Sequence, residues 1–497
     1  MGSRNPGALP VRFATRSLDF ARDDDLASMI RFFNTYSRAL EEFAPRDPPN
    51  VSIYTCGPTV YSHAHIGNFR AYIFEDLLQR HLEARGFNVR RVMNITDVDD
   101  KTIRGARAAK VSLNDFTDPF KRGFFEDLET LRIKRADEYP GATEPRYLAR
   151  MIEMISELIK RDLAYQAEDK SVYFRINKFP DYGKLAHLNL EELRPTGRVR
   201  NDEYEKENIG DFALWKAWDE ADGEVGWDSP WGRGRPGWHI ECSAMATSLL
   251  GDQIDIHCGG VDNIFPHHEA EIAQSEGVTG KKFVRYWMHC AHLLVDNQKM
   301  SKSLGNFYTL RDVTAKGYSG REVRYALLRV HYRAQLNFTF EGMEESRQAL
   351  MRVDEWLQRL RETSASASPG KGAGPVPTDD FQSALDDDLN ISGALGILFE
   401  AIRETNRAMD ANELGADGAK AWLQWWEEIN QVLALEARES MASPPEIEKL
   451  AEARRLARLA NDWQKSDELR RKLNARGWEV RDTKDGQKIT RRVGIKP

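Results

Sequence analysis

Val51-Ser52-Ile53-Tyr54-Thr55 opens the part of the chain that decides the fold, because its β-branched and aromatic residues predict a buried strand. Helical spacing follows from Ile66 to Arg85 and ends at Gly86, and the run from Asn88 to Ile95 predicts a second buried strand. A strand, a helix and another strand in this order are typical of a doubly wound, Rossmann-like α/β domain. Ligands of such domains bind at the carboxyl ends of the strands.

The α/β pattern is interrupted and then resumes. Strand-like residues return at Ile254-Asp255-Ile256-His257, followed by a helix entered through Pro266 and by a further strand-like run from Trp287 to Val295. Beyond Asn306 the pattern is helical, and Ser364 to Thr378 is nearly all small residues, glycine and proline, as in a linker. We therefore expect a disordered extension at 1–28, a Rossmann-like domain at 29–114 and 238–303, an insertion at 115–237, helices at 304–363, a linker at 364–378, a helical bundle at 379–442 and a small basic module at 443–497.

The bulk composition limits the class of protein. With 497 residues the chain is too long for one core, and roughly 150 residues per domain predicts about three domains. Four cysteines in this length cannot form a disulfide framework, so reduced thiols or metal ligands and a cytoplasmic location are expected. No run of about 18 apolar residues exists, so no membrane-spanning segment is expected.

Charge is distributed unevenly along the chain. The formal net charge is −7, yet residues 449–497 hold 15 Lys and Arg against 7 Asp and Glu. A basic tail on an acidic body can mark a module that binds phosphates, and a solvated helix face is the alternative.

His63-Ala64-His65-Ile66-Gly67-Asn68 follows the first strand and opens the helix. The N-terminus of a helix suits a triphosphate, because it presents unpaired N–H groups and the positive end of the helix dipole. Imidazoles at this place can donate to phosphate oxygens, and glycine at position 67 lets a flat base lie on the backbone. The alternative is a helix cap with an incidental histidine.

Two further segments suit the same nucleotide. Lys299-Met300-Ser301-Lys302-Ser303 carries two lysines on a loop of small residues, which can bind a departing pyrophosphate, although a loop of this kind is often only solvated. Gly259-Gly260-Val261-Asp262 follows a strand, where a carboxylate can accept hydrogen bonds from both ribose hydroxyls. A plain turn is the alternative for Asp262.

Four side chains form a candidate metal site. Cys56 lies at the end of the first strand, and Cys242 lies at the end of the returning α/β half. His267 and Glu271 are spaced i, i+4 and share one helix face. Because strand ends of this fold converge on one crevice, the two thiolates, the imidazole and the carboxylate can meet, and this donor set suits Zn²⁺. Inert buried cysteines and hydrogen-bonded core histidines are the alternative.

The paired segments resemble known signatures. His65-Ile66-Gly67-Asn68 and Lys299-Met300-Ser301-Lys302-Ser303 resemble the HIGH and KMSKS signatures of class I aminoacyl-tRNA synthetases, in the correct order, with Asn68 in place of the last histidine. From about Ile30 to the C-terminus the chain also resembles cysteinyl-tRNA synthetases, with Ala270 where the family usually has asparagine. The matching segments are CGPTVY at Cys56, NITDVDDK at 94–101, GWHIECS at Cys242, FPHHEAE at 265–271 and ALDDDLN at 384–390.

The resemblance implies ATP-dependent activation of L-cysteine to cysteinyl-adenylate, release of pyrophosphate, and transfer of cysteine to the 3′ end of tRNA(Cys). It implies Mg²⁺ with ATP and one Zn²⁺ that recognises the substrate as thiolate. Within this family 304–363 is expected to contact the tRNA stem, 379–442 to form an anticodon-binding bundle, and 443–497 to recognise the anticodon. The sequence does not determine the oligomeric state, and a monomer is the simplest expectation.

The resemblance also assigns roles to single residues. His65 and Lys302 are expected to be catalytic, and Cys258 and Cys290 to be free thiols. The expected ATP contacts are His63, Gly67, Asn68, Asp262, Lys299 and Lys302; the expected substrate contacts are Thr96 and Trp238; the expected zinc ligands are Cys56, Cys242, His267 and Glu271; the expected anticodon contacts are Trp463 and Asp482. For Trp463, a place in the core of the small module is the alternative.

A bound zinc ion would explain how the protein selects cysteine over serine. Cysteine and serine differ by one atom, and a pocket that reads shape alone rejects such a near-isostere only by about 10²-fold. A thiol is a soft ligand, whereas a hydroxyl is hard and keeps its proton at neutral pH. Four protein ligands normally make a closed site, so the substrate sulfur must enter as a fifth ligand or loosen Glu271.

Two other functions fit part of the sequence. A ligase that joins cysteine to an amino sugar would share the ATP and zinc core but lack the helical and basic parts from Asp379 onward. A non-catalytic zinc protein that binds RNA through its tail would not need the Lys302 loop.

Overall fold

Four parallel strands form the central sheet, in the order β11-β10-β3-β4. β3 (Asn50–Thr55) pairs with β4 (Asn88–Met93) on one side and with β10 (Ile254–Gly260) on the other, and β11 (Val284–Cys290) pairs with β10. The chain passes from β3 outward to β4 and later from β10 outward to β11, so the strand order reverses between β3 and β10. Open α/β sheets bind ligands beyond the carboxyl ends of the strands at such a switch point.

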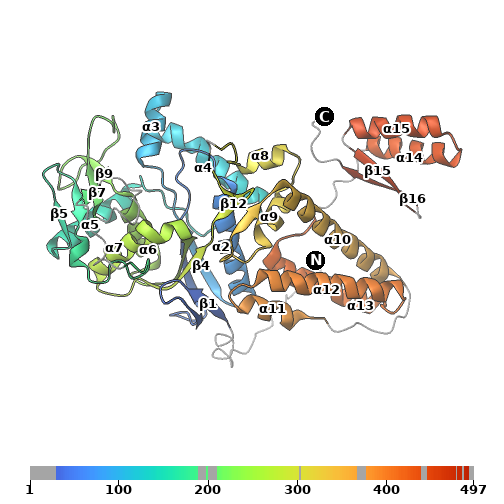
Figure 1. The fold of residues 1–497 in the computed structure, drawn as a ribbon, viewed down its shortest axis with the longest axis horizontal. Coiled ribbons are helices and arrows are strands. Elements are labelled where there is room, and N and C mark those ends of the chain that lie inside the picture. The colour runs from blue at the N-terminus through green and yellow to red at the C-terminus, as the bar shows by residue number, and fades with distance from the viewer. Residues whose placement is uncertain are drawn as a thin grey trace, which may run out of the picture.

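Helices cover both faces of this sheet (Figure 1). α2 (Ile66–Ala84) packs on one face with Ile53, whereas Tyr54, the next residue of the same strand, packs on the other face. That second face is covered by α5 (Pro145–Lys160), α6 (Trp238–Leu250) and α7 (Glu269–Thr279). Successive side chains of a strand point to opposite faces, so two separate cores form. The expected doubly wound, Rossmann-like fold is confirmed.

The structure is a computed structural model that describes residues 30–188, 198–199, 210–301, 304–366, 376–437, 445–476, 478–483 and 486–491. The expected extension at 1–28, Lys302 and most of the expected linker at 364–378 lie outside these residues. Within the described part, no helix is long and apolar enough to cross a membrane.

Two helices lead from β4 toward the insertion. α3 (Asp100–Ala109) and α4 (Leu113–Thr130) follow β4, and Phe124 and Leu128 of α4 belong to the same hydrophobic core as α2. A small sheet in the order β5-β6-β8-β7, with β9 beside β8, follows α5. Its elements are β5 (Ala164–Gln166), β6 (Val172–Phe174), the short 3₁₀ turn Ile176–Lys178, β7 (Arg198–Val199), β8 (Asp211–Ala217) and β9 (Gly234–Pro236).

Two expected elements differ in the structure. The helix that we expected to enter through Pro266 begins at Glu269, because a kinked turn at Ile264–His268 comes first, with Phe265 in an extended conformation. The expected run from Trp287 to Val295 is divided between β11 and β12 (Leu293–Val295), which belong to different sheets. A local pattern of apolar residues cannot reveal such a change of sheet.

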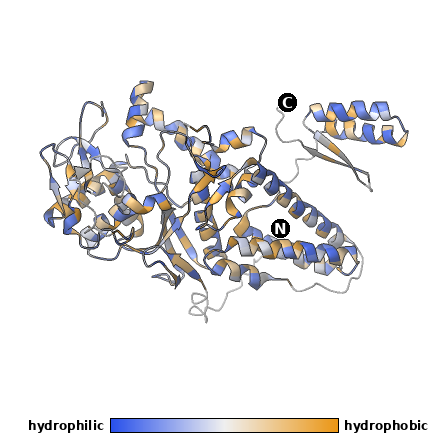
Figure 2. Ribbon diagram, in the orientation of Figure 1, coloured by the Kyte–Doolittle hydropathy of each residue, from blue (hydrophilic) through white to orange (hydrophobic). Residues whose placement is uncertain are grey.

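The chain beyond the central sheet is mainly helical. α10 packs on α13 through Trp356 and Trp425, whose ring centroids lie 6.4 Å apart. Figure 2 shows hydrophobic and hydrophilic residues alternating along these helices, as expected of helices that bury one face. The elements are β13 (Gln298–Lys299), α8 (Leu310–Ala315), α9 (Gly320–Leu328), β14 (Leu336–Phe338), α10 (Phe340–Ala365), α11 (Thr378–Asp386), α12 (Ile391–Asp410) and α13 (Ala416–Leu433).

Two smaller units complete the fold. The first is the hairpin of β1 (Arg31–Asn34) and β2 (Ala39–Glu42). The second is a C-terminal module with its own small core, which includes Ile447, Leu473 and Val480. The module consists of α14 (Pro445–Leu459), α15 (Trp463–Ala475), β15 (Trp478–Thr483) and β16 (Gly486–Arg491).

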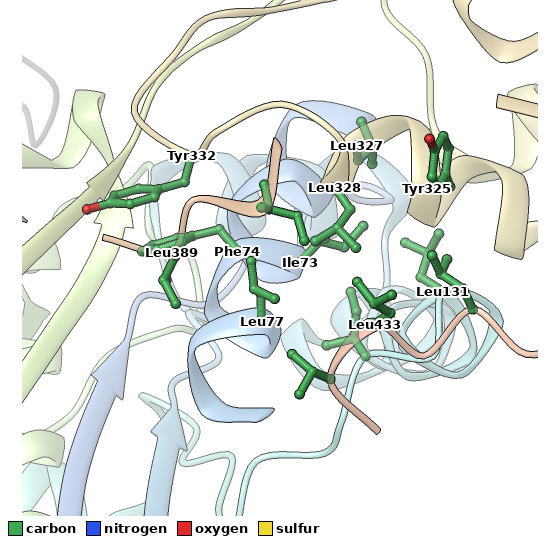
Figure 3. Packing of buried hydrophobic residues seen from close by; sticks show 14 of the residues in the cluster. Ile73, Phe74, Leu77, Leu131, Tyr325, Leu327, Leu328, Tyr332, Leu389 and Leu433 are labelled. Atoms are coloured by element: carbon green, nitrogen blue, oxygen red, sulfur yellow. The ribbon is translucent and has the colours of Figure 1, made fainter. Parts of the chain in front are cut away.

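Asp388 connects the helical bundle to the central domain through hydrogen bonds. Leu389, its neighbour, packs with Phe74 and Leu77 of α2 in one apolar cluster (Figure 3). The buried Asp388 carboxylate accepts hydrogen bonds from the Phe33 N–H at 2.8 Å and the Tyr332 hydroxyl at 2.6 Å. It also accepts one from Nε of Arg333, at 2.6 Å. One carboxylate therefore joins β1, the segment after α9 and the bundle.

We expect Asp388→Asn to weaken this joint by about 1–3 kcal/mol, because the amide has one acceptor oxygen and leaves donors unsatisfied. Asparagine tolerates the left-handed backbone (φ 58°) of this position, so the substitution tests the carboxylate alone. Differential scanning calorimetry should show a lower melting temperature. Asp387→Asn is the matched control, because Asp387 pairs with Arg31 at a site where both side chains are about half exposed. If both substitutions lowered the melting temperature equally, the role of Asp388 in joining the bundle to the central domain would be contradicted.

Candidate active site

A cavity of about 600 Å³ lies at the switch point between β3 and β10. Residues that the sequence assigned to ATP, to the amino acid and to the metal line the same cavity. These residues are Cys56, His63, His65, Gly67, Asn68, Thr96, Trp238, Cys242, Asp262, His267 and Lys299. The convergence of strand ends expected from the fold therefore brings three predicted sets of residues together.

The first turn of α2 forms one wall of this cavity. His65 is the N-cap: its Nδ1 accepts a hydrogen bond from the Asn68 N–H at 3.2 Å, and its own N–H donates to Oδ1 of Asn68 at 3.1 Å. This reciprocal capping box fixes the helix start. Because Nδ1 serves the cap, a contact from the ring to a ligand must come from Nε2. The helix cap and the expected phosphate site are thus compatible.

His63 lies between the cavity and α4. Its ring packs edge-on against Phe120, with centroids 5.3 Å apart, and a side chain on Gly123 would approach the ring to 2.8 Å. Burial lowers the pKa of His63, and the nearby charge of Arg311 lowers it further. Arg311 is in turn held by Asp127, with Nη1 2.7 and 2.6 Å from the two carboxylate oxygens. His63 is therefore held as a neutral imidazole.

The segments on either side of Lys302 pack on the same helix start. Met300 lies over Gly67, where an added Cβ would come within 2.7 Å of its methyl carbon. The Ile66 N–H donates to the Tyr308 carbonyl at 3.0 Å, and the rings of His65 and Phe307 lie 5.1 Å apart. Lys302 itself is outside the described residues, and Lys299, at the end of β13, lines the cavity.

The expected metal ligands lie together, and three of them, Cys56, Cys242 and His267, line the cavity. Cys56, Cys242, His267 and Glu271 each offer a donor atom within 4.8 Å of the others. Nε2 of His267 is 3.3 Å from Oε1 of Glu271, and Sγ of Cys56 is 4.0 Å from the same oxygen. Cys56 follows β3 as expected, whereas Cys242 lies in α6, before β10 and so at the start of the returning α/β half rather than at its end.

Sequence reasoning missed two further donors. His257 and His268 form a second set with Cys56 and Glu271. Nε2 of His268 lies 3.3 Å from Sγ of Cys56, and Nε2 of His257 lies 3.0 Å from Oε2 of Glu271. His257 ends the strand expected at 254–257, which is the one signal that could have identified it, although β10 continues to Gly260.

Hydrogen bonds between histidines orient this cluster. Nδ1 of His267 lies 2.9 Å from Nδ1 of His239, and Nδ1 of His268 lies 2.8 Å from Nε2 of His289. His289 in turn lies 2.8 Å from the Thr35 hydroxyl. In metal sites a ligating histidine usually bonds a second group through its other nitrogen, which fixes the ring. Both His267 and His268 thus turn Nε2 toward Glu271 and Cys56.

The protonation states fit a metal ion. Burial lowers the pKa of His239, His267 and His289 to about 3, so these imidazoles are neutral, as metal ligands must be. Burial raises the pKa of the Cys56 thiol well above its ordinary value, and the hydrogen bond with Cys242 raises it further. Without a cation both thiols keep their protons, and a bound divalent cation would displace them. Two thiols, an imidazole and a carboxylate are a donor set that suits zinc.

The remaining predicted residues lie as follows. Asp262 is exposed, in the short turn Val261–Asn263 after β10. Trp463 lies in the C-terminal module and is 55% exposed, so the alternative that it forms the core of the module is wrong. The side chain of Asp482 is outside the described residues. Cys258 and Cys290 are free thiols, as expected.

Comparisons with known proteins show the family of the chain. The family model "tRNA synthetases class I (C) catalytic domain" matches residues 42–348. The cysteine–tRNA ligase of Protochlamydia amoebophila is 49% identical over 470 residues, which cover 93% of this chain and 97% of that one. The cysteine–tRNA ligase of Chlamydia trachomatis is 51% identical over 475 residues, which cover 92% of this chain and 98% of that one.

This chain belongs to the cysteine–tRNA ligase family.

The C-terminal parts match models found with this family. The DALR domain model matches residues 380–437, and the model of the cysteinyl-tRNA ligase anticodon binding domain matches residues 442–489. Solved structures share the fold at low identity. Methionyl-tRNA synthetase of Mycobacterium tuberculosis, bound by methionyl-adenylate, aligns with a TM-score of 0.56 at 15% identity over 78% of this chain and 88% of that chain. The LeuRS–tRNA–LeuAMS complex of Agrobacterium radiobacter aligns with a TM-score of 0.56 at 11% sequence identity. The alignment covers 80% of this chain and 86% of that chain.

Within this cysteine–tRNA ligase fold, Glu75 of α2 is a buried carboxyl group in the cavity lining. Burial raises its pKa from 4.5 to about 8, although the charge of Arg91 and the Thr55 hydroxyl lower it. Between these two pH values the folded chain keeps a proton that the unfolded chain releases. The contribution of Glu75 to the stability must therefore fall as the pH rises from about 4.5 to about 8.

We expect Glu75→Gln to remove this pH dependence, because the amide does not ionise. The gain in stability over the unaltered chain should be small at pH 5, grow to the order of a few kcal/mol at pH 8 and remain constant above it. Melting temperatures measured across this range test the prediction. A difference between the two proteins that does not change with pH would contradict it.

Proposed function

We propose that this chain activates L-cysteine with ATP to form cysteinyl-adenylate and pyrophosphate, and then transfers cysteine to the 3′ end of tRNA(Cys). The observation that carries the proposal is one cavity lined by two sets of residues. The N-terminus of α2 brings His63, His65 and Asn68 to its lining, and the metal-ligand cluster brings Cys56, Cys242 and His267. A nucleotide and a small thiol held there would meet inside the cavity.

The first set of residues binds and orients ATP, which enters with Mg²⁺. His65 and Lys302 act on the charge that develops at the α-phosphate and on the departing pyrophosphate. His63, Asn68 and Lys299 contact the phosphates. Gly67 contacts the nucleotide, and Asp262 accepts from the ribose hydroxyls.

The metal-ligand cluster holds the amino acid. Cys56, Cys242, His267 and Glu271 bind one zinc ion. When bound, zinc supplies a soft Lewis acid that favours a thiolate over a hydroxyl. Nε2 of His257 lies 3.0 Å from Oε2 of Glu271 and would hold this carboxylate if the substrate sulfur took its place at the metal. Thr96 and Trp238 line the cavity beside this cluster and contact the rest of the substrate.

The C-terminal parts bind tRNA, and Trp463 with Asp482 contacts the anticodon. Trp463 is exposed, and the Arg458 guanidinium lies 5.2 Å from its ring centroid. Such a pair offers a face on which a splayed-out base can stack, for about 1–3 kcal/mol. A ligase for an amino sugar would not need this module, which distinguishes the two functions.

Cysteine-dependent exchange of labelled pyrophosphate into ATP tests the activation step, with serine as the control amino acid. The proposal expects exchange with cysteine and almost none with serine. Exchange that is equal for the two amino acids would contradict thiol recognition, and no exchange with either would contradict the activity.

Cys242→Ser should lower the zinc content and raise the KM for cysteine by about tenfold or more, because a ligand that zinc binds as thiolate is lost. Metal analysis of the purified protein and exchange kinetics measure both effects. Cys258→Ser is the matched control, since Cys258 is equally buried but belongs to neither donor set. A Cys242→Ser variant that lacks zinc and still prefers cysteine as before would refute the proposal.

Deletion of residues 443–497 should leave cysteinyl-adenylate formation intact and lower tRNA charging by about 10²-fold, through weaker tRNA binding. The physical reason is that the module has its own small core, so its loss leaves the cavity residues in place. Pyrophosphate exchange and charging assays on the same preparation separate the two steps. Full charging by the shortened chain would show that the module does not read the anticodon.

A further inference from the structure

One edge of the His63 ring packs against α4. Its Nδ1 is buried, and no hydrogen bond to this nitrogen is formed within the described residues. A Cβ built on Gly123 of α4 would come within 2.8 Å of Nδ1 of His63 and within 3.0 Å of Nη2 of Arg311. The imidazole and the guanidinium therefore pack on the same point of the helix, where only glycine leaves room for both.

α4 holds the Arg311 guanidinium in this position. Nη1 of Arg311 lies 2.7 and 2.6 Å from the two carboxylate oxygens of Asp127, which is 3% exposed. Nη2 donates to the Gly123 carbonyl at 3.3 Å and to Glu126 at 3.0 Å. Burial raises the pKa of Asp127 from 3.8 to about 6, although Arg311 lowers it, so the carboxylate is ionised at pH 7. Charge-assisted hydrogen bonds thus keep a positive charge beside His63.

This positive charge determines which ring nitrogen of His63 carries hydrogen. A guanidinium has only donors, so an N–H at Nδ1 would face a positive charge and have no acceptor, whereas a lone pair there is favourable. A neutral imidazole with its lone pair on Nδ1 carries hydrogen on Nε2, and the ring lines the cavity. Burial and the charge of Arg311 on α8 both lower the pKa of His63, and the opposite effect of Glu126 on α4 is smaller.

We propose that Arg311 and Asp127 are positioning residues that hold His63 in the tautomer with hydrogen on Nε2, so that it donates to the phosphates of ATP without taking up a proton. The inference rests on the proposed function, in which His63 contacts the phosphates, and deepens it. A triphosphate favours the charged form of any imidazole beside it. The fixed charge of Arg311 opposes this effect, and His63 keeps one protonation state with and without ATP.

The test measures the protons taken up when MgATP binds, by isothermal titration calorimetry at pH 7 in buffers that differ in ionisation enthalpy. Arg311→Met together with Asp127→Asn removes both charges and leaves no unpaired carboxylate. His63→Gln keeps an N–H donor but cannot ionise. Arg321→Met with Asp354→Asn is the matched control, because this pair also has two bonds of 2.8 Å but does not affect the pKa of His63. Melting temperatures are measured for every variant.

We expect His63→Gln alone to leave the proton uptake of the unaltered chain unchanged. The variant with Arg311→Met and Asp127→Asn should take up roughly half a proton more per MgATP, because the pKa of His63 returns toward about 6.5 and the bound phosphates raise it further. Adding His63→Gln to this variant should abolish the extra uptake. The control pair should show none.

Three results would overturn the inference while MgATP binding leaves the proposed function intact. They are no extra uptake in the variant that lacks the pair, extra uptake that persists after His63→Gln, and a lower uptake when His63→Gln is made in the otherwise unaltered chain. The last comparison uses proteins that keep Arg311 and Asp127, so it decides the question even if the variant without them does not fold. If the unaltered chain bound no MgATP, the proposed function would fail, and the inference with it.

Discussion

The structure depends on one constraint of the parallel sheet: β3 and β10 are neighbours, and both end at the same edge. Residues that follow these strands must therefore share a small space, however far apart they lie in sequence. At two points a glycine lets the backbone of one segment lie directly against the backbone of another, which makes this space smaller. A side chain on Gly57 would lie 1.8 Å from the Asn94 carbonyl oxygen, and one on Gly237 would lie 2.1 Å from that of Ala213. Glycine at these points lets the thiol-bearing segments pack against their neighbours.

Burial then determines the chemistry of the metal-ligand cluster. His267, which packs against Trp238, and His289, which stacks with Trp287, are neutral, since desolvation lowers the pKa of both to about 3. Thiols buried beside them cannot ionise unless a cation arrives. A cluster of neutral donors around one carboxylate is electrostatically incomplete, and a divalent cation completes it.

Local patterns predicted the elements that build the site. The β-branched residues before Cys56 and the helical spacing after His65 identified β3 and α2, and parts of the two signatures, at His65 and at Lys299, line the cavity. Geometry that depends on distant residues could not be predicted this way. His257 and Glu271 meet only because β10 and α7 pack together. The spacing of these two residues in the sequence does not predict their contact. The hydrogen bond from the Thr96 hydroxyl to Oε2 of Glu241 spans 145 residues of sequence, so it follows from the sheet and not from any motif.

The central claim is that the paired thiols hold a zinc ion that takes the sulfur of the substrate. X-ray absorption at the zinc edge tests it most directly, because it counts sulfur neighbours of the metal in solution. The account predicts that the number of sulfur neighbours rises by one when L-cysteine is added to the zinc-containing protein and does not change with L-serine. A sulfur count that stays the same while cysteine is bound would contradict it.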